Sequence, residues 1–165
     1  MNRIVIVLLR IGIVAAALLG LFGQIVVIPT TAADEVDSFP PYAPFAAPYA
    51  AVAIVGVACV QVVLVAVWML LSMVRRDAIF TPRAFRWVDI IIGSSVVATL
   101  LAIGVAGHLS VASIPSPGDG MDVISALAAA VASVGVGVLF AMLVVVMRSL
   151  LRKATDLQTE IAEVI

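Results

Sequence analysis

The chain has 165 residues, of which 64% are hydrophobic and only 12% are charged, and its formal net charge at pH 7 is −1. Soluble domains carry about 25% charged residues, so the mean hydropathy of +1.28 places most of this chain in lipid rather than around a soluble core. The single cysteine, Cys59, excludes an intrachain disulfide, and together with the single histidine, His108, it is too little for a His/Cys metal site. We therefore expect no metal or other cofactor.

The apolar residues fall into four long runs, which predict an all-α, polytopic membrane protein with a single domain. A membrane helix needs about 20 apolar residues, whereas a barrel strand needs about 10 with polar alternation, so strands are excluded. Prolines argue against helix beyond the outer ends of the first three runs. The predicted spans are residues 5–28, 49–74, 88–109 and 122–147.

The first span carries two polar side chains and a row of small residues. Arg10 lies toward its N-terminal end, and Gln24 lies in its other half. Gly12, Ala16 and Gly20 recur every four residues, and such rows let membrane helices approach one another closely. This row therefore predicts a contact with another span.

Residues 29–48 are predicted to form an external loop, acidic at its start and rich in proline and aromatic residues after that. Tyr42, Phe45 and Tyr49 are suited to anchoring at the outer headgroup level. Two interpretations remain open: an ordered interfacial loop, and a cap over the helices that faces a ligand.

Three uncharged polar side chains are predicted at membrane depth. Gln61 falls near the middle of the second span, while Gln24 and His108 fall in the outer halves of the first and third spans. Either they line a polar cavity, or they form hydrogen bonds between helices, each worth about 0.6 kcal/mol on average. The second role is the commoner one for such groups.

Residues 75–87 are predicted to form a cytoplasmic turn. Thr81 is a good N-cap and Pro82 a good first helical residue, so the third helix should begin near Pro82. The turn carries four arginines, namely Arg75, Arg76, Arg83 and Arg86. We expect their side chains to face anionic lipid headgroups. Because membrane topology alone explains these arginines, no direct binding of nucleic acid is predicted.

Asp89 lies at the inner end of the third span, toward the same side as Arg10. A single charge at the bilayer centre costs about 2.5–3.5 kcal/mol on insertion scales, so the two side chains are predicted to form an ion pair between helices. Arg86 competes for the same carboxylate from three residues away. The pair is either a structural clasp or a group that responds to protons or voltage.

The fourth span carries a ladder of small residues at every fourth position: Ser125, Ala129, Ser133, Gly137 and Ala141. The first span carries the other such row. Because small residues allow close approach of helix backbones, we predict that the first and fourth spans are neighbours.

The tail, residues 148–165, is predicted to continue the fourth helix into the cytoplasm. Apolar residues recur there at spacings of 4, 3, 4 and 3: Leu150, Ala154, Leu157, Ile161 and Val164. This pattern is a short a/d seam. It indicates either a docking helix, for a copy of itself or a cytosolic regulatory protein, or a helix that lies on the membrane or frays.

Charge is segregated between the two sides of the predicted spans. One side carries nearly all the basic residues: Arg3, Arg75, Arg76, Arg83, Arg86, Arg148, Arg152 and Lys153. The other side carries only acidic ones: Asp34, Glu35, Asp37, Asp119 and Asp122. By the positive-inside rule the basic side is cytoplasmic, which predicts a multi-pass protein of the cell inner (plasma) membrane with both termini in the cytoplasm.

Two segments resemble the bacterial membrane-protein family called domain of unknown function 2975. Val74–Gly93 (VRRDAIFTPRAFRWVDIIIG) is similar to the family's basic turn into the third helix, and Leu150–Ile165 (LLRKATDLQTEIAEVI) to its closing cytoplasmic segment. The resemblance covers nearly the whole chain. It implies a four-helix membrane protein without an assigned activity or known catalytic residues. Some members are encoded beside small helix-turn-helix regulators, which suggests a regulatory role.

Three classes of function follow from these features. The favoured one is a regulatory, sensor or structural membrane protein that signals or docks through its turn and tail. The alternative is a small-solute transporter or channel, although the first span lacks an embedded acid and no pair of proline-broken spans marks a transport site. An enzyme is not expected, because His108 is the only imidazole and no catalytic constellation accompanies it.

Overall fold

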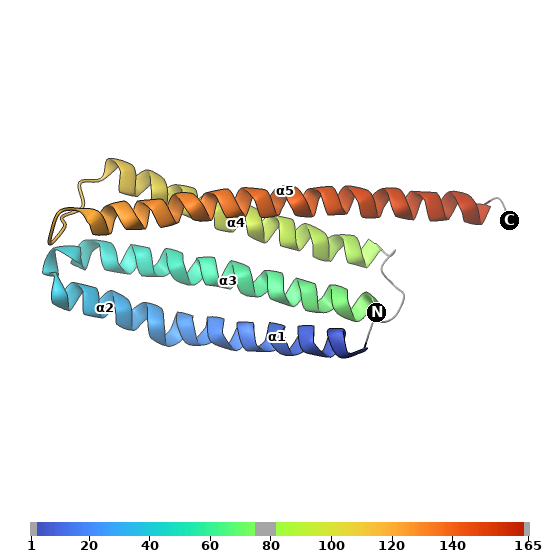
Figure 1. Ribbon diagram of the computed structural model, residues 1–165, viewed down its shortest axis with the longest axis horizontal. Helices are drawn as coiled ribbons and strands as arrows, with labels where there is room; N and C mark the ends of the chain where they lie inside the picture. The colour runs from blue at the N-terminus through green and yellow to red at the C-terminus, as the bar shows by residue number, and fades with distance from the viewer. Residues whose placement is uncertain (1–2, 75–81, 164–165) are drawn as a thin grey trace.

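The computed structural model describes residues 3–74 and 82–163 of the chain (Figure 1). In chain order the elements are α1 (Arg3–Phe22), the π-helical turn η1 (Gly23–Val27), α2 (Ile28–Ser38), the 3-10 turn η2 (Pro40–Tyr42), α3 (Ala43–Val74), α4 (Pro82–Val111) and α5 (Met121–Glu163). Every element in these two ranges is helical, which confirms the all-α prediction. The start of α4 at Pro82 is also as predicted, while Thr81 lies outside the described residues.

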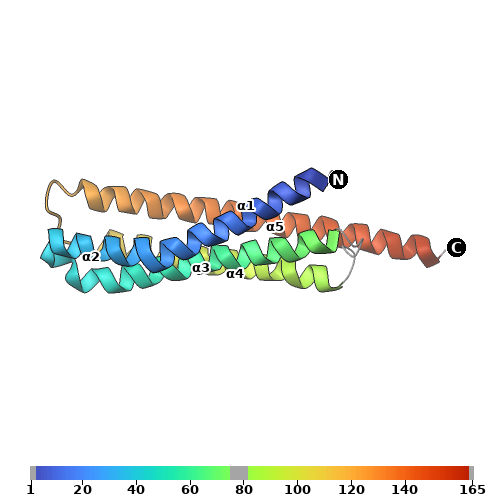
Figure 2. The same cartoon turned by 90° about the horizontal axis from the view of Figure 1, so that it is seen from below.

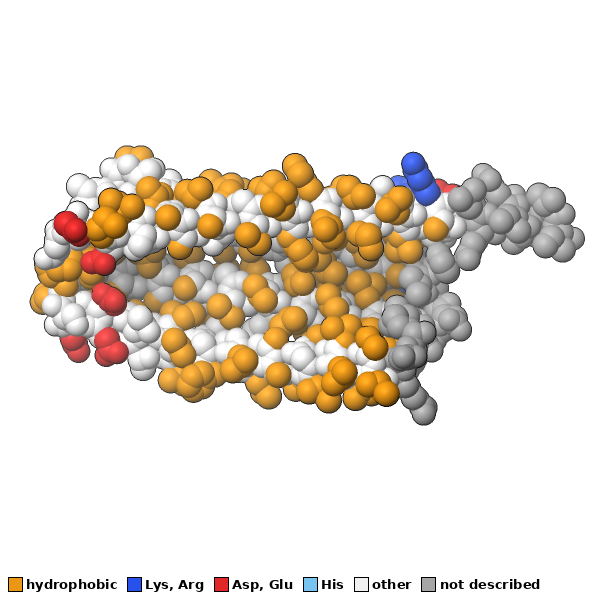
Figure 3. Space-filling model, in the orientation of Figure 1, with side chains coloured by type: hydrophobic (Ala, Val, Ile, Leu, Met, Phe, Trp, Pro, Cys, Tyr) orange, Lys and Arg blue, Asp and Glu red, His pale blue; other side chains and the backbone are white. Residues whose placement is uncertain are grey.

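Four helical stretches are long and apolar enough to cross a membrane: Ile4–Ser38, Pro40–Met73, Arg83–Val111 and Met121–Asp156. Large apolar side chains cover the outside of the molecule, and acidic side chains gather at one end (Figure 3). Ile4, Leu19 and Ile25 are each 71% exposed. Lipid is the solvent that such a surface requires, so the chain is a multi-pass membrane protein.

The helices form an open row rather than a closed bundle (Figures 1 and 2). α5 packs against α4, α4 packs against α3, and α3 packs against both α1 and α2. Within the described ranges α1 makes no contact with α5, so the predicted pairing of the first and fourth spans is wrong. Of the row on α1, only Gly20 packs on α3, against Gln61 and Val57, whereas Gly12 and Ala16 are exposed.

The core of the row is a buried stripe along α4. Its members recur every three or four residues: Ala84, Val88, Ile91, Ser95 and Thr99. The two hydroxyls are satisfied within the helix, because Ser95 donates to the Ile91 carbonyl at 2.7 Å and Thr99 to the Ser95 carbonyl at 2.8 Å. Thr99 meets Gly137 of α5, where an added Cβ would overlap the Thr99 hydroxyl. Gly137 of the small-residue ladder therefore serves the α4–α5 contact, whereas Ser125, Ala129 and Ser133 are exposed.

Residues 29–48 differ from the predicted external loop, because most of them are helical. α2 continues the first helix through Pro29, and α3 begins at Ala43 and contains Pro48. A proline ring inside a helix clashes with the carbonyl four residues earlier, which for Pro29 belongs to Ile25. Ile25 lies in the wider π-helical turn, where the Ile28 amide bonds back to Gly23. This turn gives the proline ring room, so proline does not end the helix.

α5 is one unbroken helix of 43 residues, about 65 Å long at 1.5 Å per residue. The tail therefore continues the fourth helix, as predicted, through Glu163. Its last turns extend beyond the start of α4, and the beginning of α1 and the end of α5 lie at the same end of the molecule (Figure 1).

Candidate functional site

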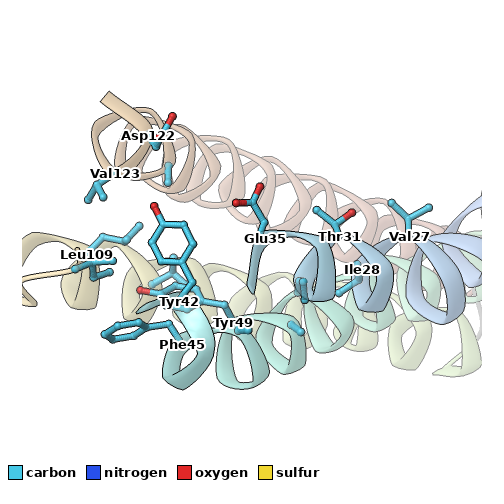
Figure 4. Close-up of a pocket in the computed structure, with 17 residues that line it drawn as sticks. Val27, Ile28, Thr31, Glu35, Tyr42, Phe45, Tyr49, Leu109, Asp122 and Val123 are labelled. Atoms are coloured by element: carbon cyan, nitrogen blue, oxygen red, sulfur yellow. The ribbon is translucent and has the colours of Figure 1, made fainter. Parts of the chain in front are cut away.

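A pocket of about 520 Å³ opens at the acidic end of the molecule, between α2, α3 and the facing ends of α4 and α5 (Figure 4). Its wall is mainly apolar, with Val27, Ile28, Ala53, Leu109 and Val123 among the lining residues. Its size lies in the usual range for small-molecule sites, about 300–1,000 Å³.

The polar groups of the pocket come from different helices. Thr31 and Glu35 extend from α2, and Asp122 lies in the first turn of α5. Figure 4 shows Tyr42 in the space between the α2 segment and the start of α5. Because α2 and α5 make no contact with each other in the described chain, a bound molecule would bridge two otherwise separate elements.

Aromatic side chains form the floor on the α3 side. Tyr42, Phe45 and Tyr49 all line the pocket. The Tyr49 hydroxyl and His108 Nδ1 share a hydrogen bond of 2.7 Å, and the two rings meet edge to face at 5.7 Å between centroids. Phe45 approaches His108 from the same helix, with centroids 6.2 Å apart.

His108 itself opens onto a second cavity of about 400 Å³ on the other side of these aromatic rings. Phe45, Tyr49 and Val105 line both cavities and so form the wall between them. The Tyr49–His108 hydrogen bond joins α3 to α4. His108 thus forms a hydrogen bond between helices, and it also lines a cavity; these were the two roles predicted for it.

Arg10 and Asp89 are not brought together, which corrects the predicted ion pair. α1 and α4 make no contact in the described chain, because α3 lies between them. The Arg10 guanidinium instead lies 4.9 Å from the centroid of the Trp68 ring on α3. A cation–π contact of this kind stabilises an arginine where water is scarce.

Asp89 pairs with Arg148 of α5. Arg148 Nε lies 2.8 Å from Oδ1, and Nη2 donates a hydrogen bond of 3.2 Å to Oδ2. The Arg148 side chain is 43% exposed and the Asp89 side chain is 48% exposed. The pair joins α4 and α5, the two helices with the most extensive contact, at the basic end of the molecule.

Gln24 and Gln61 both lie at the contact between the first helix and α3. Gln24 Nε2 donates to the Ile54 carbonyl at 3.0 Å, which is the predicted hydrogen bond between helices. Gln61 Nε2 is buried without a hydrogen-bond partner among the described residues. It lies where a Cβ on Gly20 would be 3.0 Å away, so the glycine makes room for the amide.

Two of the four arginines predicted to contact headgroups are described by the structure. Arg83 and Arg86 are exposed at the start of α4, whereas Arg75 and Arg76 lie outside the described residues. In the tail, Leu150 is 56% exposed and Ala154 is also exposed. The side chains of the other three seam residues lie outside the described set: Leu157, Ile161 and Val164.

Sequence reasoning missed the polar part of the pocket. Glu35 and Asp122 lie far apart in sequence, and were counted only as acidic residues of the outer side. The available signal was the combination of that acidity with the aromatic residues Tyr42, Phe45 and Tyr49 in one segment. Arg148 was also missed as the partner of Asp89, although both fall at the same end of consecutive spans.

Comparison with the curated proteins and with the solved structures finds no match to the chain. A family match covers residues 30–165, that is, most of α2 and all of α3, α4 and α5. It includes every residue that lines the pocket except Val27 and Ile28, and it leaves out Arg10 and Gln24. The predicted resemblance is confirmed: the chain belongs to the DUF2975 family, whose members are described as proteins of unknown function.

Proposed function

We propose that this protein is a small membrane sensor or regulator, which receives a signal at the acidic-end pocket and reports it through the tail of α5. The observation that carries the proposal is the continuity of α5. The same helix lines the pocket with Asp122, Val123 and Ala126, and it ends in the tail with the exposed Leu150 and Ala154. Because the helix is continuous, a displacement of its pocket end would also move its tail end.

The packing of α5 supports such a displacement. α5 contacts only α4 within the described chain, so it can shift without breaking contacts to α1, α2 or α3. A molecule held between Glu35 of α2 and Asp122 of α5 would favour one position of α5 over another. Ligands change the population of conformations only through such differential contacts. The pocket therefore has the geometry to bias the tail.

The proposed orientation places the pocket outside the cell and the tail in the cytoplasm. Five of the described basic residues lie where α4 begins and α5 ends: Arg83, Arg86, Arg148, Arg152 and Lys153. Five acidic residues lie at the other end, around α2 and the start of α5: Asp34, Glu35, Asp37, Asp119 and Asp122. This distribution follows the positive-inside rule, with both termini in the cytoplasm.

A single-cysteine labelling experiment checks this orientation. In a Cys59→Ser background, a cysteine at the exposed Arg86 should react with a membrane-impermeant maleimide only after permeabilisation. A cysteine at the exposed Ser113 should react in intact cells. Ala84 is a poor position for such a probe, because the structure buries it completely. Labelling of Arg86→Cys in intact cells would contradict the proposed orientation.

The role of the tail is tested by co-purification from membranes. Removing residues 150–165 should abolish recovery of the tail's partner, whether a second copy or a cytosolic protein, while Arg148 and its ion pair remain. Leu150→Asn should reduce recovery several-fold, because Leu150 lies on the a/d seam. Ser149→Asn, one residue away and off the seam, serves as the matched control. Equal recovery with and without residues 150–165 would contradict docking through the tail.

A small-solute transporter is the second candidate, and one observation favours it. The sequence showed no pair of broken spans, yet the structure places the π-helical turn Gly23–Val27 in the first span and Pro48 inside α3. Breaks of this kind mark functional sites in many membrane proteins. The transporter requires net flux of a solute through proteoliposomes, whereas the sensor requires none.

A further inference from the structure

The pocket at the acidic end has a lining that discriminates between classes of ligand. Most of its wall is apolar, which favours an organic body over a hydrated inorganic ion. None of its lining residues is a lysine or an arginine, so an anionic ligand would find no opposite charge there. The lining thus favours a molecule with an apolar body.

Three aromatic side chains add a second preference. Tyr42, Phe45 and Tyr49 line the pocket together, and all belong to the η2–α3 segment. The faces of aromatic rings attract cations, and groups of such rings recognise quaternary ammonium groups. Tyr49 is held in place by its 2.7 Å hydrogen bond to His108 Nδ1. The aromatic wall therefore favours a positive charge on the ligand.

Two carboxylates give a third preference with the same sign. Glu35 of α2 and Asp122 of α5 line the pocket from opposite elements, and Figure 4 shows both beside the ring of Tyr42. Asp122 lies in the first turn of α5, where the helix dipole favours negative charge. Charge complementarity therefore favours a cation between the two helices.

We propose that this pocket binds an amphipathic organic cation, in which an apolar body carries one delocalised or quaternary positive charge. The proposal rests on the proposed sensor function, because it names the class of signal that the same pocket receives. The apolar body lies against Val27, Leu109 and Val123, and the charge lies near Glu35 and Asp122.

A pair of probes with the same shape and opposite charge tests this assignment. The full-length protein in lipid nanodiscs is dialysed against radiolabelled tetraphenylphosphonium, and against tetraphenylborate, with empty nanodiscs subtracted for partition into lipid. The protein should bind the phosphonium saturably at one site per chain and bind the borate at least about tenfold more weakly. Phosphonium binding should weaken at high salt, because charge attraction is screened.

Two double variants of equal charge change separate the site from the general acidity of this end. Glu35→Gln/Asp122→Asn should weaken phosphonium binding at least about tenfold. Asp34→Asn/Asp37→Asn removes two charges from the same end at residues that do not line the pocket, and should leave the affinity within about twofold. Ala126→Phe, which fills the pocket from α5, should also abolish saturable binding.

Equal binding of the two probes, or equal effects of the two double variants, would overturn the proposal, because the pocket would then hold any apolar molecule, including a lipid acyl chain. Failure of the sensor function is a separate result. If the phosphonium binds as expected but never changes recovery of the tail's partner, the proposed ligand class is supported and the proposed sensor function is contradicted. If it does not bind while the tail still docks its partner, the ligand class alone falls.

Discussion

Replacing Gly137 by leucine should destabilise the protein by about 1–3 kcal/mol, the usual cost of forcing extra side-chain volume into a packed interface. The reason is the contact between α4 and α5. A Cβ at position 137 would overlap the Thr99 hydroxyl and lie 3.3 Å from the Thr99 Cβ. Thr99 is itself buried at 9% exposure, so it has little room to move. The effect is measured as the temperature at which half of the detergent-solubilised protein is lost from the monodisperse fraction.

Gly135 provides the matched control for this prediction. It belongs to the same helix, and a Cβ built there has nothing within 4 Å. Gly135→Leu gains the same helix propensity and the same apolar surface, and it should leave the transition temperature unchanged or raise it slightly. The milder Gly137→Ala should be partly rescued by Thr99→Ala, which removes the overlapping hydroxyl. Equal stability of the two leucine variants would refute the proposed close approach.

The number and nature of the helices could be predicted from sequence, because they depend on local apolar runs. The neighbours of each helix could not. The small-residue rows at Gly12–Gly20 and Ser125–Ala141 marked helix contacts only in part, at Gly20 and Gly137, and a row of small residues does not identify the partner helix. In the folded chain Gly20 and Gly137 pack on different helices, α3 and α4 respectively, because the helices form an open row.

Proline was the main source of error in the boundaries. Pro29 and Pro48 each argued for the end of a span, because a proline lacks the amide hydrogen and crowds the preceding turn. The structure keeps both inside continuous helical stretches, and the π-helical turn before Pro29 accounts for the first of them. A π-helical turn leaves no composition signal, so the helical character of residues 29–48 was not predictable.

The candidate site was only partly predictable for a related reason. The aromatic residues at Tyr42, Phe45 and Tyr49 were recognised as a group, because they are close in sequence. Glu35 and Asp122 come together with them only when α2 folds back on α3 and α5 begins beside α4. The partner of Asp89 was unpredictable for the same reason. A charge at membrane depth requires a partner, but whether Arg10 or Arg148 supplies it depends on which helices are neighbours.

Reversing the charge of Asp89 should destabilise the protein, and reversing Arg148 as well should restore much of the loss. Asp89→Arg places two guanidinium groups where an ion pair with a 2.8 Å contact now lies. Like charges about 4 Å apart repel by about 1 kcal/mol in water and about 4 kcal/mol at an effective dielectric constant of 20. Because both side chains are nearly half exposed, we expect a loss of about 1–2 kcal/mol.

The double variant Asp89→Arg/Arg148→Asp re-forms the pair with its charges exchanged, so it should recover at least about half of that loss. Arg152→Asp is the control, because it reverses an exposed charge one turn further along α5 and should leave stability within about 0.5 kcal/mol. The destabilisation by Asp89→Arg should also shrink in 1 M salt, where the screening length is about 3 Å. Strictly additive losses from the two reversals would mean that Asp89 and Arg148 do not interact. α4 and α5 would then be held together by the apolar stripe and the Gly137–Thr99 contact alone, and a ligand-driven shift of α5 would meet no electrostatic resistance at the basic end.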